Sequence, residues 1–288
     1  MSAIFKHELS SYFKGMTAYV FGAFLLLVTG LYVADAHLVA NSVHFEAVLS
    51  AVSFTFMLLV PILTMRVLSE ERRQKTDQLL YSLPISMTDV VLGKYLAMLV
   101  TFLLPVAIIS LYPLVLSSYG EVNLRLAYSG IGTFFLLGAA LIAMGTFVSV
   151  LTETQVASAG LCFVVMLANF FLSGIAALIP TTAVASLVAL TVVVLVIAFI
   201  TWQLTKNTTM ALAVATVLMG ITLAVYLMKK SLLVGLVPNV LNELSLYQRF
   251  YNVLSGEFDI GSIVYYLSVI GIFLFLTVQS MEKRRWSE

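Results

Sequence analysis

Charged residues are scarce in this 288-residue sequence. Lys, Arg, Asp and Glu make up 10% of it, whereas 61% is hydrophobic, and the mean hydropathy is +1.06. Soluble domains carry about 25% charged residues, so this composition excludes a soluble globular protein and predicts a polytopic membrane protein. The net charge of +1 offers no basic surface for a nucleic acid, and we expect none as a partner.

Cysteine and histidine are equally rare. The single cysteine, Cys162, lies in an apolar run, and its being alone excludes an intrachain disulfide. The three histidines are too few for a buried metal cage. Four residues of metal-ligand types, Asp35, His37, His44 and Glu46, lie in one short loop, but their spacing matches no known site. We expect a solvated loop there and no metal.

The motifs of ATP hydrolysis are missing as well. Gly93-Lys94 is followed by Tyr95 rather than Ser or Thr, and the earlier glycine of a phosphate-binding loop is absent. The apolar segments also contain no Asp, Glu or His, the residues that proton- or sodium-driven carriers usually bury on their ion path. We therefore expect a chain that is no enzyme by itself, binds no cofactor, and takes its energy from elsewhere.

Long apolar segments account for most of the chain. A helix crosses a bilayer with about 20 apolar residues, and eight windows qualify. They cover residues 18–34, 47–66, 92–117, 127–151, 156–179, 182–203, 209–228 and 261–280. The sixth and seventh windows are either two full spans or a hairpin that enters from one side. The predicted fold is an all-α polytopic bundle of about eight transmembrane helices in one transmembrane domain, 1–288.

The distribution of Lys and Arg predicts the orientation. Placing both termini in the cytosol puts eleven basic residues inside and four outside, and the inverted arrangement reverses this bias. The four outside are Arg125, Lys229, Lys230 and Arg249. The sequence therefore predicts a multi-pass protein of the cell membrane with both termini cytoplasmic.

Two amphipathic patterns lie outside the apolar windows. Within residues 1–17, apolar and charged side chains alternate at helical spacing, which is typical of a helix lying along the inner membrane surface. Glu8 is expected on its polar face. Within 229–260, Ser245-Leu-Tyr-Gln248 is a capping box and Gly256 can end the helix that follows. We expect an external interfacial helix there.

A charged segment, residues 66–94, separates the second and third apolar windows. The second span is expected to continue as a charged helix over Val67–Lys75, and a capping box, Ser86-Met-Thr-Asp89, is expected to open the third. Between them, three leucines form a small apolar face. They are Leu79, Leu80 and Leu83, and Pro84 follows them. A solvated loop does not need such a face, whereas a docking surface does.

Four sequence pieces resemble one family of membrane proteins. They are the leader Ile-Phe-Lys-His-Glu-Leu-Ser-Ser-Tyr-Phe from residue 4; Glu70-Glu71-Arg-Arg-Gln-Lys-Thr76-Asp77-Gln-Leu-Leu80 with Leu83-Pro84-Ile85-Ser86 and Leu92-Gly93-Lys94; Leu-Thr-Glu153-Thr-Gln155; and Tyr265-Tyr266-Leu-Ser with Glu282-Lys-Arg-Arg-Trp286. The chain resembles the membrane subunit, or permease, of ABC-type exporters of the second exporter class, most closely those named after gliding motility. The second piece is the specific one, although Lys75 stands where the family usually has Gly.

The resemblance implies a fold and partners. It implies a six-helix core with an N-terminal elbow helix and a cytosolic coupling helix, so that 182–228 would be an added helix pair. It also implies two copies of a separate ABC ATP-binding subunit, which hold the ATP and Mg, and a second copy of this permease or a related one. The residues implied to couple to the ATPase are Glu70, Glu71, Arg72, Arg73, Thr76, Asp77, Leu79, Leu80, Leu83, Pro84 and Glu153.

Other functions stay open at this point. Glu153 either contacts the ATPase or caps the fifth span at its positive end. A non-transporting membrane anchor or signalling subunit would carry the same coupling motifs. An ion-coupled secondary carrier would need ion ligands, which the apolar windows do not supply.

Overall fold

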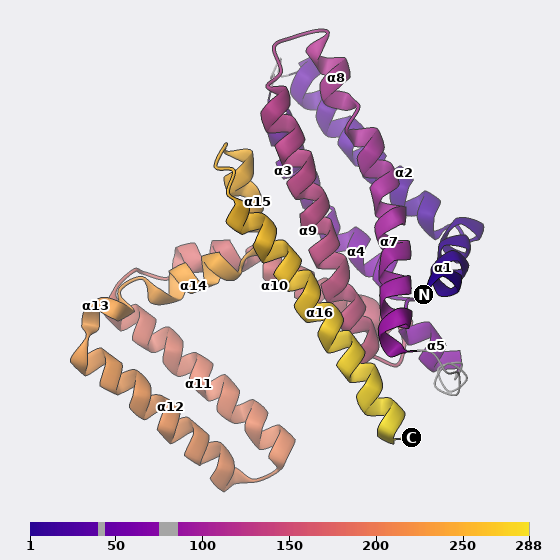
Figure 1. Ribbon diagram of the computed structural model, residues 1–288. Helices are drawn as coiled ribbons and strands as arrows, with labels where there is room; N and C mark the ends of the chain where they lie inside the picture. The colour runs from indigo at the N-terminus through magenta and orange to yellow at the C-terminus, as the bar shows by residue number, and fades with distance from the viewer. Residues whose placement is uncertain (40–43, 75–85, 288) are drawn as a thin grey trace. The chain divides into compact units, whose positions relative to one another are not determined.

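The computed structural model of the protein describes residues 1–39, 44–74 and 86–287, and every regular element in these ranges is a helix (Figure 1). They form two compact units: unit 1 comprises Met1–Phe170 and Arg249–Glu288, and unit 2 comprises Phe171–Gln248. The elements are α1 (Ser2–Lys14), α2 (Thr17–Val33), the π-helix η1 (Ala34–Val39), α3 (Phe45–Ser53), α4 (Phe56–Thr64), α5 (Ser69–Gln74), α7 (Met87–Ile109), α8 (Tyr112–Ser117), α9 (Leu124–Leu151), α10 (Gln155–Leu178), α11 (Ala183–Thr205), α12 (Thr208–Met228), α13 (Lys230–Leu233), α14 (Leu236–Leu244), α15 (Leu246–Leu254) and α16 (Ile260–Ser287).

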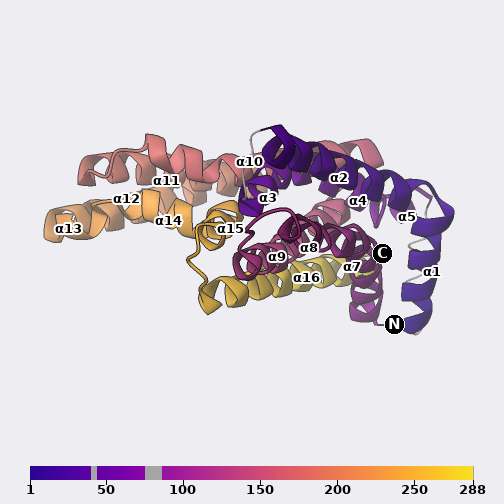
Figure 2. The same ribbon diagram turned by 90° about the horizontal axis from the view of Figure 1, so that it is seen from above.

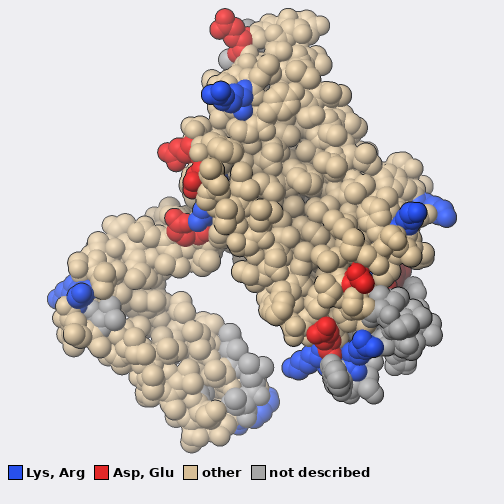
Figure 3. All heavy atoms as spheres, viewed as in Figure 1, with Lys and Arg blue, Asp and Glu red and all other residues tan. Residues whose placement is uncertain are grey.

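The predicted membrane spans are confirmed as helices. Within the described residues, seven helices are long and apolar enough to cross a membrane, or eight if the bent pair α3 and α4 is one span. The all-α polytopic fold predicted from the sequence is therefore confirmed. In unit 1, a broad uncharged area separates the charged side chains at the two ends of the visible face (Figure 3).

The second predicted span is not one straight helix. Its two halves, α3 and α4, are bent by 52° at the break between Ser53 and Phe56. The Ser53 hydroxyl donates to the Ser50 carbonyl, and the Thr55 hydroxyl donates to the Val52 carbonyl, each at 2.7 Å. Hydroxyls that bond back to carbonyls one turn earlier bend helices, and two of them flank this break.

Helix α9 lies at the centre of unit 1 and packs against α16, α4 and α7 (Figure 2). Fully buried phenylalanines fill the contact: the rings of Phe56 and Phe134 have centroids 4.6 Å apart, and those of Phe56 and Phe102 are 5.6 Å apart. A glycine on α9 makes room for them, because a Cβ atom on Gly138 would lie 2.4 Å from Phe102. Small residues let helices approach closely in lipid.

The amphipathic N-terminal segment forms α1, which packs against α7. A Cβ atom on Gly93 would lie 3.2 Å from Ile4, so this glycine allows the close approach of the two helices. The Tyr12 hydroxyl, buried against α4, donates to the Leu63 carbonyl at 3.4 Å. Burial raises the pKa of this phenol, and the nearby Glu8 carboxylate raises it further, so Tyr12 acts as a neutral donor.

The start of α1, the helix α5 and the end of α16 lie at the same end of unit 1 in both views (Figures 1 and 2).

The predicted helix caps are present. Ser86 accepts a hydrogen bond from the Asp89 amide at 3.2 Å at the start of α7, and Ser245 accepts one from the Gln248 amide at 3.2 Å at the start of α15. Gly256, at φ +92°, follows the end of α15 as predicted.

Unit 2 contains the helix pair expected at 182–228. Helices α11 and α12 pack on each other, and both also contact the short helix α13. Thr182 caps α11 by accepting a hydrogen bond from the Ala185 amide at 3.3 Å. At the tip, Lys206 adopts a left-handed conformation, φ 53°, which reverses the chain into α12.

Candidate functional site

A buried lysine joins three separate elements of unit 1. The Lys94 ammonium, on the second turn of α7, lies 2.6 Å from the Glu8 carboxylate of α1 and 2.8 Å from the Glu71 carboxylate of α5. It also donates to the Val67 carbonyl at 3.0 Å. We call these four residues the Lys94 junction. Its lysine is only 3% exposed, so its charge depends on these partners rather than on water.

The Lys94 junction corrects one prediction from the sequence. Glu8 was expected on the polar face of the N-terminal helix, turned away from the protein. Its side chain is instead 18% exposed and bonded to Lys94. Burying an uncompensated charge is costly. The buried Lys94 ammonium is therefore paired with the carboxylates within its reach, and Glu8 is one of them.

The charged helix predicted after the second span is interrupted. Turns occupy Met65–Leu68, and α5 begins only at Ser69. The amides of Leu68 and Ser69 both donate to the Ser149 hydroxyl of α9, each at 3.3 Å. The expected continuity with the second span is wrong, because this tertiary contact takes amides that a straight helix would have bonded internally. A charged helix does form inside the expected range, as α5.

A second ion pair ties α5 to the turn between α9 and α10. Arg72 donates to the Glu153 carboxylate at 3.1 Å and to the Thr152 carbonyl at 3.2 Å. Glu153 is 79% exposed and Arg72 is 22% exposed. The bond to Glu153 therefore adds little stability, since exposed pairs contribute about 0–1 kcal/mol, but it connects α5 with the α9–α10 turn.

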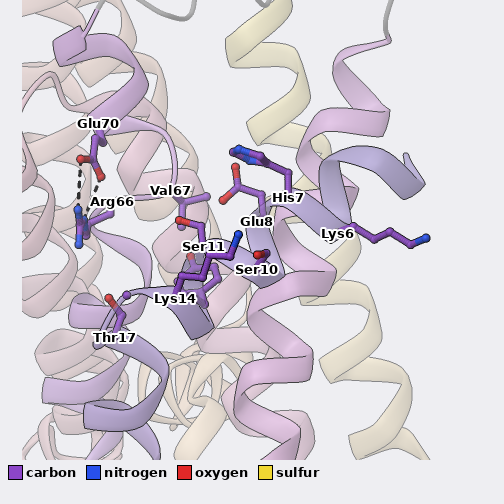
Figure 4. Close-up of a pocket in the computed structure, with 12 residues that line it drawn as sticks. Lys6, His7, Glu8, Ser10, Ser11, Lys14, Thr17, Arg66, Val67 and Glu70 are labelled. Atoms are coloured by element: carbon purple, nitrogen blue, oxygen red, sulfur yellow. Dashed lines mark hydrogen bonds and ion pairs between the residues drawn. The ribbon is translucent and has the colours of Figure 1, made fainter.

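A third pair lies at the entrance to α5. The Arg66 guanidinium donates to both oxygens of Glu70, at 2.9 and 3.2 Å. The hydrogen bond to the Glu70 carboxylate raises the pKa of Arg66. These two residues border a cavity of about 670 Å³ whose other side is α1 (Figure 4).

The structure places five of the eleven residues predicted to couple to an ATPase. Glu70, Glu71, Arg72 and Arg73 lie on α5, and Glu153 lies in the turn that Arg72 contacts. The other six, Thr76, Asp77, Leu79, Leu80, Leu83 and Pro84, lie outside the described residues. Whether any of the eleven couples to an ATPase stays a prediction.

Sequence reasoning missed the roles of Lys94, Glu8 and Ser149. One signal could have found the lysine: it stands inside an apolar window, and a charge in such a window is costly enough to require partners. No local signal identifies Glu8 or Ser149, which are 86 and 80 residues distant from the residues they contact.

The candidate site shows no metal centre among the residues that the structure describes. Within the described ranges, no group of three or more His, Cys, Asp or Glu side chains is placed to hold a metal ion. Glu8 of α1, Glu71 of α5 and Lys94 of α7 instead form ion pairs with one another. This arrangement can hold helices in register and pass a movement of α5 to α1, α7 and the α9–α10 turn.

Comparison with known proteins gives a family match. Residues 19–151 match the family model described as ABC-2 family transporter protein. The matched range contains the charged segment 66–94 and ends at the last residue of α9. The match supports a permease of an ABC transporter of the ABC-2 type. A search of the curated proteins gave no match.

Proposed function

We propose that this chain is the membrane subunit of an ATP-driven exporter and that it couples to a separate ATP-binding subunit through residues 66–94. The observation that carries the proposal is the match to the ABC-2 transporter family over residues 19–151. That range brackets a charged segment between two apolar helices, and the chain has no phosphate-binding loop of its own.

The proposed mechanism begins at the charged segment. ATP binding closes a pair of ATP-binding subunits, and Leu79, Leu80 and Leu83 follow that movement because they fill an apolar groove on the partner. Glu70, Glu71, Arg72 and Arg73 set the orientation and rate of association. The movement then reaches α7 and α1 through the Lys94 junction, and α9 through Arg72 and Ser149.

The proposed assembly contains two permease chains and two ATP-binding subunits, in the cell membrane, with both permease termini cytoplasmic. The orientation is supported by the eleven-to-four distribution of basic residues. It is also supported by the position of the start of α1, α5 and the end of α16 at one end of unit 1.

Two measurements test the proposal. The purified chain alone should hydrolyse no ATP above a mock preparation, whereas the chain expressed with the ABC ATP-binding subunit from its own operon or gene neighbourhood should co-purify with it. ATP turnover by the isolated chain contradicts the proposal. A chain that transports in vesicles without any ATPase, driven by an ion gradient, would instead be a secondary carrier.

Cysteine labelling tests the orientation. The only native cysteine, Cys162, is buried, so the background is low. Cysteines introduced at Gln74, Asn41 and Asn242 should be treated with an impermeant thiol reagent in intact cells. Only the last two should react, and Gln74 should react only after permeabilisation. Reaction at Gln74 in intact cells would reverse the topology.

A further inference from the structure

The cavity between α1 and the Arg66–Glu70 pair has the lining of an anion site. Its volume is about 670 Å³, and both its walls belong to unit 1 (Figure 4). Basic side chains and hydroxyls dominate the lining. They are Lys6, His7, Lys14 and Arg66, and Ser10, Ser11 and Thr17. Lysine and arginine supply charge to a phosphate group, and hydroxyls donate to its oxygens.

The charges that face the cavity do not cancel. Its two acids are already bonded to bases, Glu70 to Arg66 at 2.9 Å and Glu8 to Lys94 at 2.6 Å. Lys6 and Lys14 have no carboxylate within 4.0 Å among the residues that the structure describes. Lys14 therefore brings to the cavity a positive charge that no carboxylate of the described residues pairs with, and this favours an anionic ligand beside it.

The two lysines differ in direction. In Figure 4 the Lys14 side chain lies beside Ser10 and Ser11, whereas Lys6 extends away from them. Lys14 ends α1, and Thr17 begins α2, whose N-terminus has no side-chain cap. The partial positive charge of that helix end adds to the charge of Lys14 on the same side of the cavity.

The surface next to the cavity is apolar. Met16, Tyr19 and Val20, which flank Thr17 in the sequence, are 82%, 62% and 53% exposed. They stand at the beginning of a membrane-spanning helix, where the headgroups of the lipids meet their acyl chains. An anion held at Lys14 thus lies at headgroup depth, beside side chains suited to acyl chains.

We propose that this cavity binds the phosphate group of an anionic phospholipid headgroup, with Lys14 as its principal cation and the hydroxyls of Ser10, Ser11 and Thr17 as donors. The lipid would lie against α1 and the start of α2, and so at the elements that the Lys94 junction connects. The site does not depend on the proposed coupling to an ATPase.

The test compares lipid binding by matched variants of the full chain. Purified protein in detergent is titrated with a phosphatidylglycerol or a phosphatidylcholine, and bound lipid is counted by native mass spectrometry. The wild type should prefer phosphatidylglycerol. Lys14→Gln should weaken that binding by about fivefold, the equivalent of ~1 kcal/mol for one basic residue near a membrane surface. Lys14→Arg should retain it, which also shows that substitution at this exposed position leaves the fold intact.

Lys6→Gln is the matched control, because it removes the same charge from the same helix but from a side chain that points away. Equal losses in Lys6→Gln and Lys14→Gln would mean general surface attraction and would overturn the site. So would the absence of any preference for phosphatidylglycerol. Inorganic phosphate is added in a separate arm, and displacement of phosphatidylglycerol by it would overturn the lipid as the ligand and leave a free phosphate site.

Discussion

Replacing Lys94 with methionine should destabilise the protein more than any other single loss of a basic residue in its described charged segments. The change keeps most of the length of the side chain but removes the charge that Glu8 and Glu71 share at 2.6 and 2.8 Å. Removing one partner of a buried ion pair costs about 3–5 kcal/mol. Glu8 and Glu71 remain 18% and 25% exposed, so water compensates in part, and we expect a loss of about 3 kcal/mol.

The assay is thermal unfolding of the purified full chain in detergent. Taking about 2–4 °C per kcal/mol, Lys94→Met should lower the unfolding midpoint by about 6–12 °C. Lys6→Met, which removes an exposed lysine from α1, should leave it nearly unchanged.

A compensated variant separates charge from packing. The triple variant Lys94→Met, Glu8→Gln, Glu71→Gln removes the two carboxylates that the single change leaves facing each other, so it should regain most of the lost stability. If Lys94→Met unfolds at the wild-type temperature, or if the triple variant is less stable than the single one, the Lys94 junction does not hold these helices together.

Two further predictions concern the contacts of α5 and α9. Arg72→Gln should lower the unfolding midpoint more than Glu153→Gln. The ion pair itself is exposed and contributes about 0–1 kcal/mol, but Arg72 also donates to the Thr152 carbonyl. Equal effects of the two changes would contradict a role for the Thr152 bond. Gly138→Ala should destabilise the protein by about 1–3 kcal/mol, because its Cβ atom would lie 2.4 Å from the buried Phe102 ring. Gly132→Ala is the control on the same helix: its Cβ atom would have nothing within 4 Å, so the change should be neutral or slightly stabilising. A harmless Gly138→Ala would contradict the packing of α9.

The parts of the fold that the sequence predicted correctly are those set by local patterns. Apolar length alone predicts the spans, because backbone groups in lipid must be bonded within the helix. The caps at Ser86 and Ser245 were also predictable, since a capping hydroxyl and the amide it accepts from lie three residues apart.

The parts that were not predicted depend on contacts between distant segments. The bend between α3 and α4 lies where the Ser53 and Thr55 hydroxyls bond back to carbonyls of α3. The interruption before α5 lies where two amides donate to Ser149, a residue of another helix. The partners of Lys94 are set by the docking of α1 on α7, which neither helix reveals alone. The N-terminal helix was predicted as a helix, but the direction of Glu8 was not.

The proposed docking of an ATP-binding subunit on residues 66–94 is tested most directly by co-purification of that subunit with a Leu79→Asp, Leu80→Asp variant. Full burial of a leucine is worth roughly 1.5–3 kcal/mol, so losing two should weaken binding more than tenfold. Gln78→Asp, which adds an acid to the same segment without removing a leucine, is the control, and all variants are compared at matched membrane expression. We predict that the double variant loses the ATPase while the control retains it. Full retention of the ATPase and of transport by the double variant would contradict the proposed docking.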